Sequence, residues 1–503
     1  MSLTRTQDHI STDDLERGLR RLMADAAFAT IVGTLNSGVV LVAYALYLGA
    51  TPAVIGLLAA IPFLTQLLQA PTVLLMEKVR SRRLISVGSL FIARLALPVM
   101  AVLGFIPDRT LALALLVIGE TVHCAFNAVA GCSWNSWIRD LVPDQRLGQF
   151  FARRTIYATV LGATGTAFAA GALEYAKLGD GSDRLVFFGL YMIGFVSSLV
   201  STWQLSRVPE PPMPSGPAWH SLRTLFARPF KDPNFVYLIR FMASWQFAVN
   251  LALPFFTVFF IQQLGYSAGF VLVLSIVSQL SNLLVLRFWG ELSDRFANKT
   301  VLGVTTPAFI ACIAAMALAG EFQGTTRTTY LVVMHILMGM CSAGVALASG
   351  AITLKLAPRG SAHVYVATSA LVTAAAAGSA PLIGGLYAEF FRARQLSFNI
   401  SWTAPGGVLD VVAVSFGWWQ FFFLISALFG LYALHRLSLV REEGEVKKRE
   451  MLQHVLNMAR RGVRNASPVA GLRAAVAFPG GGIMEARRLL RTPEAGRPRR
   501  EGD

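Results

Sequence analysis

The amino-acid sequence predicts an all-α membrane protein with twelve transmembrane helices in two related bundles of six. Three observations support this fold class: an apolar composition, twelve long apolar runs and a charged loop that occurs twice. Of the 503 residues, 54% are hydrophobic and 14% are charged, and the mean hydropathy is +0.56. Soluble domains carry ~25% charged residues, so most of this chain is expected to lie in lipid.

A helix needs ~20 apolar residues to cross the hydrocarbon core of a bilayer, and twelve such runs follow one another along the chain. They lie near residues 26–48, 54–76, 84–106, 111–134, 153–176, 185–205, 236–262, 268–290, 301–320, 329–352, 364–391 and 417–438. The first run follows a charged segment at residues 13–21 and has no small-residue cleavage site. This favours a retained helix over a signal peptide.

The placement of charge predicts the orientation of the chain in the membrane. The formal net charge is +16, and most loop arginines and lysines fall in the loops that follow the even-numbered runs. Short cytoplasmic loops of membrane proteins are enriched in these residues. We therefore expect a multi-pass protein of the cell (plasma or inner) membrane with both termini in the cytoplasm. Because no basic domain carries a recognisable nucleic-acid motif, we expect no nucleic-acid partner.

Proline clusters and shifts in composition divide the chain into five expected parts. These are a cytoplasmic N-terminus (1–25), a first six-helix bundle (26–205), a proline-rich cytoplasmic linker (206–235), a second six-helix bundle (236–439) and a basic cytoplasmic tail (440–503). The tail could contact anionic lipid or be a disordered solubilising segment. Segment 396–416 is too long for a tight turn, and it could extend the last helix or fold back as a lid.

The charged loop that begins at Gly290 has an earlier and weaker copy. Asp294 in the second loop corresponds to Glu77 in the first, and basic residues follow both acids. In a second pair of loops, Pro358 corresponds to Pro143, and the separation along the chain is nearly the same as for the first pair. Two loop pairs with matching separations indicate a duplicated membrane protein, which is how many secondary transporters are built.

The second loop resembles the G-x-L-x-D-R-x-G-R-K-x-x-L signature of the major facilitator superfamily. The matching positions are Gly290, Leu292, Asp294, Arg295, Lys299 and Leu302. In the first copy, Val73 and Arg80 stand where the family prefers glycine. The resemblance implies two six-helix bundles around a central cavity that opens alternately to each side of the membrane. It also assigns a gating role to Glu77, Arg82, Gly290, Asp294, Arg295 and Lys299.

Polar residues inside a spanning helix are costly in hydrocarbon, so each is expected to face a partner or a wet cavity. In the fourth run, Glu120, His123 and Asn127 form one stripe with a helical period. The separation between the two proline loops, applied to this stripe, places His335 and Ser342 in the matching stripe of the tenth run, so that Glu120 and His335 correspond. These five residues are predicted to line the substrate cavity.

The resemblance adds the first and seventh helices to the cavity lining. Polar side chains in these helices are Asn36, Tyr44, Tyr47, Gln246 and Asn250. Amides and hydroxyls of this kind can bind a neutral polar or zwitterionic solute through hydrogen bonds. For Asn36 and Asn250, hydrogen bonding between packed helices is an equally good explanation.

Two charged residues, Arg94 in the third run and Glu120 in the fourth, lie at a similar depth near the middle of the membrane. A structural ion pair between neighbouring helices would explain both charges. The alternative is a coupling role, in which Glu120, with His123 and Arg94 nearby, loses and regains a proton as the cavity alternates between wet and occluded.

The sequence therefore favours a secondary active transporter that moves a small organic solute by alternating access, with protons as the expected coupling ion. There is no ATP-binding phosphate loop, no H-E-x-x-H and no nucleophile elbow, so we expect neither an enzyme nor a cofactor. The four cysteines lack metal-ligand spacing, so no metal is expected. The expected partners are the solute, protons and the lipid bilayer, and the chain is expected to be a monomer. The alternative is a non-transporting assembly factor or receptor of a membrane complex.

Overall fold

The computed structural model describes residues 10–442 except 177–182, 214–226, 359–361, 393, 395, 405 and 406. Within this part of the chain, twelve helices are long and apolar enough to cross a membrane, which confirms the number of apolar runs. The predicted basic tail beyond its first three residues, and much of the predicted linker, lie outside the described residues.

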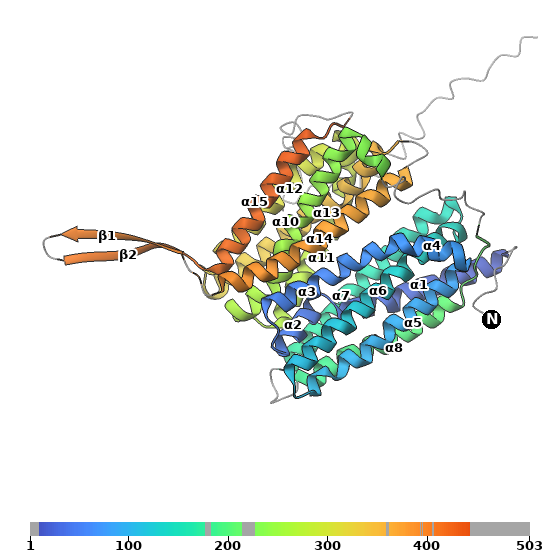
Figure 1. Ribbon diagram of the computed structural model, residues 1–503, viewed down its shortest axis with the longest axis horizontal. Helices are drawn as coiled ribbons and strands as arrows, with labels where there is room; N and C mark the ends of the chain where they lie inside the picture. Colours follow the sequence, from blue (N-terminus) through green and yellow to red (C-terminus); the bar gives the residue numbers. More distant parts are fainter. Residues whose placement is uncertain are drawn as a thin grey trace, which may run out of the picture. The chain divides into compact units, whose positions relative to one another are not determined.

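Several of the spans consist of more than one helical segment (Figure 1). The first half of the chain contains α1 (Thr12–Asn36), α2 (Val39–Tyr47), α3 (Pro52–Leu64), η1 (Thr65–Leu68), α4 (Gln69–Val79), α5 (Arg82–Ala101), η2 (Val102–Phe105), α6 (Arg109–Leu141), α7 (Asp144–Ala176) and α8 (Asp183–Ser206). The second half contains η3 (Arg228–Lys231), α10 (Pro233–Val258), the π-helical turn η4 (Phe259–Gln263), α11 (Ala268–Phe296), α12 (Asn298–Ala315), η5 (Met316–Leu318), α13 (Gly324–Leu356), α14 (Ala362–Phe391) and α15 (Trp418–Leu439). Strands β1 (Leu396–Ala404) and β2 (Gly407–Phe416) lie between α14 and α15.

The first span is not the single continuous helix that its apolar run predicts. It breaks at Ser37 and Gly38, and Gly38 has a φ of +58°, a conformation that glycine adopts without steric cost. Both residues are exposed, and no side chain caps the start of α2. Broken helices leave backbone groups without partners inside a span, which membrane proteins tolerate where these groups line a cavity.

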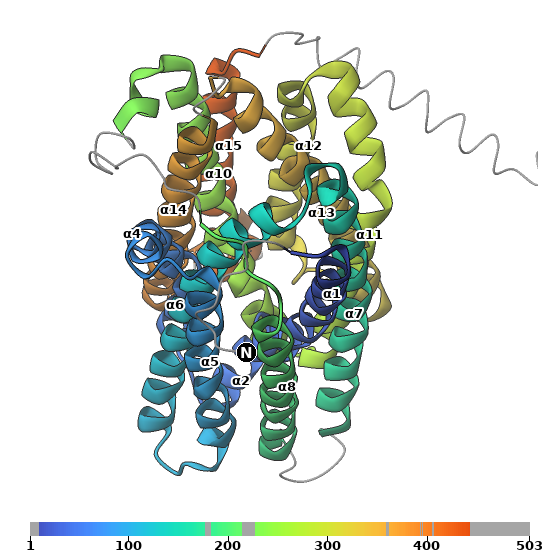
Figure 2. The same cartoon turned by 90° about the vertical axis from the view of Figure 1, so that its right-hand side faces the viewer.

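Most helix contacts lie within each half of the chain. In the first half, α1 packs on α7 and α8, and α5 packs on α6 and α8. In the second half, α10 packs on α14 and α15, and α13 packs on α11 and α12. The two halves meet mainly where α3 contacts α14 and where α7 contacts α11, and Figure 2 shows α7 beside α11.

Glycines line the crossing of α3 and α14. A Cβ atom on Gly56 would lie 2.2 Å from the carbonyl oxygen of Pro381, and one on Gly385 would lie 2.7 Å from that of Pro52. Larger residues would therefore force the helices apart. These contacts lie near the start of α3 and toward the end of α14, at the end of the bundle that carries β1 and β2, which we call the hairpin end. The opposite end, where α1 begins, is called the basic end because it carries Arg82, Arg83, Lys299 and Lys355.

β1 and β2 form an antiparallel hairpin in segment 396–416 (Figure 1). The register pairs Leu396 with Phe416 and Ala404 with Gly407, with one irregularity after Phe398. The segment therefore does not extend the last helix, which begins at Trp418. Polar and apolar residues alternate along β1, and this period of two favours a strand over a helix. The fold is all-α apart from this hairpin in the described part of the chain.

Corresponding residues in the two copies of the charged loop both have a positive φ angle. Arg80 and Ala297 occupy corresponding positions of the two copies, and their φ values are +58° and +66°. A positive φ is uncommon for a residue with a Cβ atom. Each residue lies just before the helix, α5 or α12, that follows its loop. The two copies therefore share the sign of φ at this position, although ψ is 16° for Arg80 and 153° for Ala297.

Candidate solute-binding site

A cavity of about 340 Å³ lies among helices of the second half and reaches one residue of the first half. We call it the α13 pocket. Its lining residues are Val39 of α2, Leu253, Phe256 and Thr257 of α10, Phe260 of η4, Val271, Ser275, Ser278 and Gln279 of α11, Phe309 of α12, and His335, Met338 and Ser342 of α13. The volume falls in the range of small-molecule sites, ~300–1,000 Å³. Two of the predicted cavity residues, His335 and Ser342, thus lie in one pocket.

Local irregularities of the helices shape the α13 pocket. A Cβ atom on Gly339 would lie 2.2 Å from the carbonyl oxygen of Ser278, so α11 and α13 cross in close contact beside the pocket. The turn η4 places Phe260 in the wall, and π-helical turns are frequent at functional sites. Val39 is the first residue after the break in the first span. A close helix contact, a π-helical turn and a helix break therefore occur together around this pocket.

The polar groups of the α13 pocket are uncharged amides, hydroxyls and an imidazole. His335 Nδ1 lies 2.8 Å from the carbonyl oxygen of Leu331, and a proton on Nδ1 that is donated to this oxygen leaves Nε2 as an acceptor. Asn282 Nδ2 donates to Ser342 Oγ at 2.9 Å. The side chain of Gln279 is exposed and makes no hydrogen bond with any described residue. Its amide is therefore available to a ligand.

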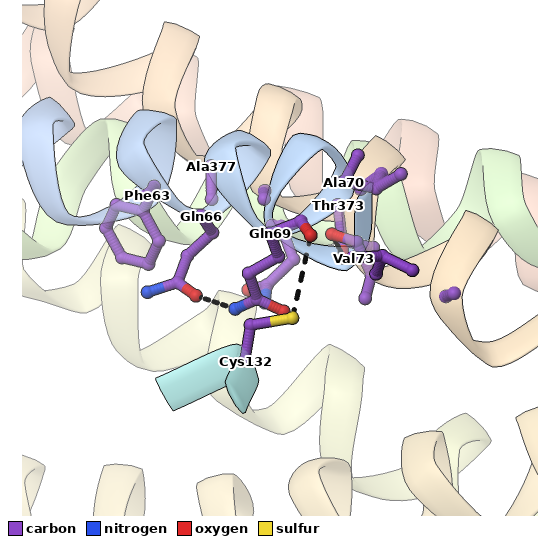
Figure 3. A pocket seen from close by; sticks show the side chains of 13 residues that line it. Phe63, Gln66, Gln69, Ala70, Val73, Cys132, Thr373 and Ala377 are labelled. Carbon is purple, nitrogen blue, oxygen red and sulfur yellow. Dashed lines mark hydrogen bonds between the residues drawn. The ribbon is translucent and has the colours of Figure 1, made fainter. Parts of the chain in front are cut away.

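A second cavity, of about 370 Å³, lies between the two halves, and we call it the α14 pocket (Figure 3). It is lined by Phe63, Gln66, Gln69, Ala70, Val73, Cys132, Gln246, Ala367, Ala370, Leu371, Thr373, Ala374 and Ala377. Gln69 Nε2 donates to Gln66 Oε1, and Cys132 Sγ donates to the carbonyl oxygen of Gln69 at 3.5 Å. The small alanines of α14 leave room for the cavity on this face of the helix.

Helix α10 contributes to both pockets. Gln246 lines the α14 pocket, and Leu253 and Thr257 line the α13 pocket. Steps of seven and eleven residues bring these three onto one face of a helix, and eleven residues extend over about 16 Å. Asn250 lies between them in the sequence, but its buried amide donates to the carbonyl oxygen of Gln246 at 2.8 Å. Gln246 thus faces a cavity, whereas Asn250 forms a hydrogen bond within α10.

Glu120 is almost completely buried in α6, with 2% of its surface exposed. Among the described residues, its one side-chain partner is Cys124, whose Sγ lies 3.1 Å from Oε1. Arg94 of α5 is also buried, but its Nη1 donates to Asn127 Oδ1 at 3.4 Å. Arg94 and Glu120 therefore do not form the ion pair that was one of the two expectations for them.

His123 and Asn127 form hydrogen bonds that link α6 to α5. His123 Nδ1 lies 3.0 Å from the carbonyl oxygen of Ala93, and Asn127 Nδ2 donates to the carbonyl oxygen of His123 at 2.7 Å. Neither the α13 pocket nor the α14 pocket includes Glu120, His123 or Asn127. Their roles in the substrate cavity and in coupling stay predictions.

A second buried carboxylate, Asp25 of α1, was missed by the sequence analysis. Asp25 Oδ1 accepts a hydrogen bond from Ser201 Oγ of α8 at 2.6 Å, and Arg94 and Arg154 act on it electrostatically. Asp25 lies directly before the apolar run at residues 26–48, so hydropathy places it in the terminal segment. Because α1 begins much earlier, at Thr12, Asp25 lies inside the helix that continues into the first span.

Asn36, Tyr44 and Tyr47 lie in packing interfaces of the first half. Asn36 is buried against Gly194 of α8, and its amide has no hydrogen-bond partner in the described structure. Tyr44 is fully buried and hydrogen-bonds to backbone groups of α5 and η2. The guanidinium carbon of Arg109 lies 5.2 Å from the ring centroid of Tyr47. The structure brings none of these three residues to either pocket.

One carboxylate follows the last helix of each half: Glu210 follows α8 and Glu442 follows α15. Each accepts a hydrogen bond from a residue of the charged loop of its half. The buried guanidinium of Arg82 contacts Asp140 and lies 4.0 Å from Glu210. In the second half, Glu442 accepts a hydrogen bond from the backbone N–H of Lys299 at 2.7 Å. Glu210 and Glu442 lie outside the apolar runs, and the sequence alone gave no reason to connect them with loops so distant along the chain.

The other predicted loop residues are less buried. Glu77 and Gly290 are half-buried, whereas Asp294 and Arg295 are exposed. The guanidinium carbon of Arg295 lies 5.2 Å from the ring centroid of Phe296. A gating role for these residues stays a prediction. No group of three or more His, Cys, Asp and Glu side chains that could hold a metal ion occurs among the described residues.

Twelve apolar helices in two contacting halves, with pockets at and near their interface, have the architecture of a membrane transporter. The sequence model of the Major Facilitator Superfamily matches residues 26–381, and the chain belongs to this superfamily. Its members are secondary transporters that work by alternating access. The family and the fold point to a transporter rather than to an enzyme.

Solved structures of transporters share this fold at low sequence identity. The nucleoside transporter NupG is 14% identical, with 85% of this chain and 100% of that chain covered and a TM-score of 0.61. A bacterial homologue of the iron transporter ferroportin in an inward-facing state is 10% identical (86% and 100% covered, TM-score 0.64). A bacterial homologue of the human lysosomal transporter Spinster is 16% identical (86% and 100% covered, TM-score 0.58). No curated protein sequence matches the chain.

Proposed function

We propose that this protein is a proton-coupled secondary transporter that moves a small organic solute across the cell membrane. The observation that carries the proposal is the α13 pocket, where helices of the second half meet Val39 beside the broken first span. Secondary transporters typically bind their solutes near the middle of the membrane, where discontinuous helices meet between the two repeats. Two features of the α13 pocket support this proposal: Val39 directly follows the break in the first span, and the π-helical turn η4 contributes Phe260 to the wall.

In the proposed pathway, the solute enters from the basic end and passes the α14 pocket. It then follows the face of α10 that carries Gln246, Leu253 and Thr257 and binds in the α13 pocket. Two close helix contacts support a barrier at the hairpin end. One is the crossing of Gly56 with α14, and the other lies near the start of α11, where a Cβ atom on Gly269 would lie 2.8 Å from the carbonyl oxygen of Ala170.

Release toward the hairpin end then requires α3 to separate from α14 and α7 to separate from α11. The basic end must close at the same time, which brings the charged loops of the two halves together. We assign Glu77, Arg82, Gly290, Asp294, Arg295 and Lys299 to this closure. Since basic loops of membrane proteins face the cytoplasm, the basic end and both termini are cytoplasmic in this proposal.

We assign proton coupling to Glu120. A buried carboxylate whose described partner is a thiol, without a cation beside it, is stable only when protonated, because burial of an unpaired charge is costly. Entry of water on the change of state removes this cost and allows the proton to leave. His123 lies one turn away on α6, and Asn127 connects the same face to Arg94. Movement of His123 or of Arg94 changes the electric field at Glu120.

The test is an uptake assay on the purified chain in lipid vesicles that contain a pH-sensitive dye. Nucleosides, sugars, amino acids and organic acids are added outside one at a time. A solute that is carried with protons changes the internal pH, and His335→Ala in the α13 pocket lowers the rate at least about tenfold. His435→Ala, at an exposed position of α15, is the matched control and leaves the rate unchanged. The proposal is contradicted if both variants transport the solute at the wild-type rate, or if no solute changes the internal pH.

A further inference from the structure

We infer that the solute is uncharged and carries a flat heteroaromatic ring with hydrogen-bonding groups on its edge. This inference rests on the proposed function and concerns the same α13 pocket. It follows from the juxtaposition of an aromatic wall, a free glutamine amide and uncharged hydroxyl and imidazole groups in a cavity without formal charges.

The first step concerns charge. None of the described residues that line the α13 pocket or the α14 pocket is Asp, Glu, Lys or Arg. A solute with a formal charge loses its hydration when it enters a site within the membrane, and this loss must be offset by an opposite charge in the wall. No such charge comes from the described lining of the α13 pocket, or from the α14 pocket with its Gln66, Gln69 and Gln246. The whole lining therefore favours an uncharged solute over an anion, a cation or a zwitterion.

The second step concerns the ring. Phe256, Phe260 and His335 follow one another along the α13 pocket, with ring centroids 6.0 Å apart for the first pair and 5.6 Å apart for the second. Phe309 of α12 adds a fourth ring to the lining. Aromatic walls favour a flat ring, because rings pack on one another in offset or edge-to-face arrangements. Phe256, Phe260 and Phe309 are each at most 5% exposed in this structure, so the ring of the solute can reach them only where they border the cavity.

The third step concerns the polar edge of the solute. The side-chain amide of Gln279 presents a donor and an acceptor side by side, and its hydrogen bonds are unused in the described structure. This geometry suits a heteroaromatic ring whose edge carries an adjacent acceptor and donor, as when glutamine pairs with adenine through two hydrogen bonds. Ser275, Ser342 and the second nitrogen of His335 provide further uncharged partners. Uncharged nucleosides combine these features in one molecule.

The experiment measures ligand binding by the thermal stability of the full-length protein in detergent. The probes are adenosine and uridine, AMP as the same kind of ring with added charge, ribose as a polyol without the ring, and lysine and glutamate as charged solutes. We expect at least one of the two nucleosides to raise the Tm in a saturable manner. At the same concentrations, AMP, ribose and the two amino acids leave the Tm unchanged.

Two variants assign this binding to the α13 pocket. Gln279→Ala removes an exposed side chain that no described residue needs as a partner, so the protein is expected to fold. We expect its affinity for the nucleoside to fall at least about tenfold. Gln204→Ala makes the same change on α8, away from both pockets, and leaves the affinity unchanged.

Four results would overturn the inference: no response to either nucleoside, equal stabilisation by AMP or an amino acid, equal stabilisation by ribose, or unchanged affinity in Gln279→Ala. The proposed function fails by a different result, in which a nucleoside binds but is not taken up by vesicles that contain the protein. Uptake of a charged solute would instead retain the proposed function and reject the inferred solute class.

Discussion

Glu210 lies at the start of α5, where its carboxylate accepts hydrogen bonds from the backbone N–H of Arg82 and from Ser81 Oγ. Glu442 makes the equivalent contacts at the start of α12, with the backbone N–H of Lys299 at 2.7 Å and with Asn298 Nδ2 at 2.9 Å. A carboxylate that follows the last helix of each half therefore caps the third span of that half. The duplication extends from the sequence to these tertiary contacts.

Replacing Glu210 with Gln is expected to destabilise the protein. Glu210 and Arg82 are each about 1% exposed, so the substitution leaves a buried guanidinium with Asp140 as its remaining acidic contact. Breaking a buried pair by removing one partner costs on the order of 3 kcal/mol. The Tm in detergent is therefore expected to fall by several degrees. Glu291→Gln, which removes an exposed pair with Arg287, is the control. Equal Tm values for the two variants would show that Glu210 does not hold α5.

The contribution of Glu442 to stability is expected to depend on pH. Burial tends to raise the pKa of this carboxyl, but hydrogen bonds from the Lys299 backbone, Lys355 and Asn298 outweigh it and hold the pKa below its ordinary value of 4.5. A lowered folded-state pKa contributes stability above the unfolded pKa, and this contribution is lost as the pH falls through the folded pKa.

The measurement is the Tm of the wild type and of Glu442→Gln between pH 7 and acid pH. At pH 7 the variant is expected to be the less stable of the two. Below the folded pKa, Glu442 is protonated and resembles glutamine in charge, so the difference between the two proteins is expected to shrink. A constant difference over the whole range would assign the effect of the substitution to packing instead of charge.

Gly56→Val is expected to hold the hairpin end open. A Cβ atom at this position would lie 2.2 Å from the Pro381 carbonyl oxygen, so any larger residue must separate α3 from α14. The readout is the rate at which a water-soluble thiol reagent modifies a cysteine introduced at Ala53, which lies in this crossing. We expect the rate to rise severalfold. Gly88→Val, where a Cβ atom meets nothing within 4 Å, is the control, and a similar rise in that variant would argue against a barrier at this crossing.

Much of the fold was predictable from sequence because the membrane imposes a simple length rule on apolar helices. The internal repeat also led from Glu120 to His335 and Ser342, and these two residues of the second half do lie in one pocket. The helix break at Gly38 was not predictable from hydropathy, since Asn36, Ser37 and Gly38 interrupt an otherwise apolar run only briefly. Segment 396–416 was expected to extend the last helix or to fold back as a lid, and neither alternative anticipated the two strands.

Other features of the candidate site were not predictable from the sequence. Ser275, Ser278, Gln279 and Asn282 recur at helical spacing in α11, but the family resemblance implies that only the first and fourth helices of each half line the cavity, and α11 is not one of these. Tyr44 was predicted to line the cavity, but it is buried between helices. A polar residue in a span can satisfy its hydroxyl by hydrogen bonds to the backbone of neighbouring helices. Hydrogen bonds between segments distant in sequence, such as those of Glu210, leave no local pattern.

The measurement that tests the account most directly is solute accumulation in lipid vesicles under an imposed pH gradient, with the wild type and Glu120→Gln compared. We expect the wild type to concentrate a transported solute severalfold above its external level. Glu120→Gln is expected to lose this accumulation but to exchange labelled for unlabelled solute at a similar rate, since exchange needs alternating access without net proton transfer. Accumulation by Glu120→Gln at the wild-type level, or accumulation by the wild type without a pH gradient, would contradict proton coupling through Glu120.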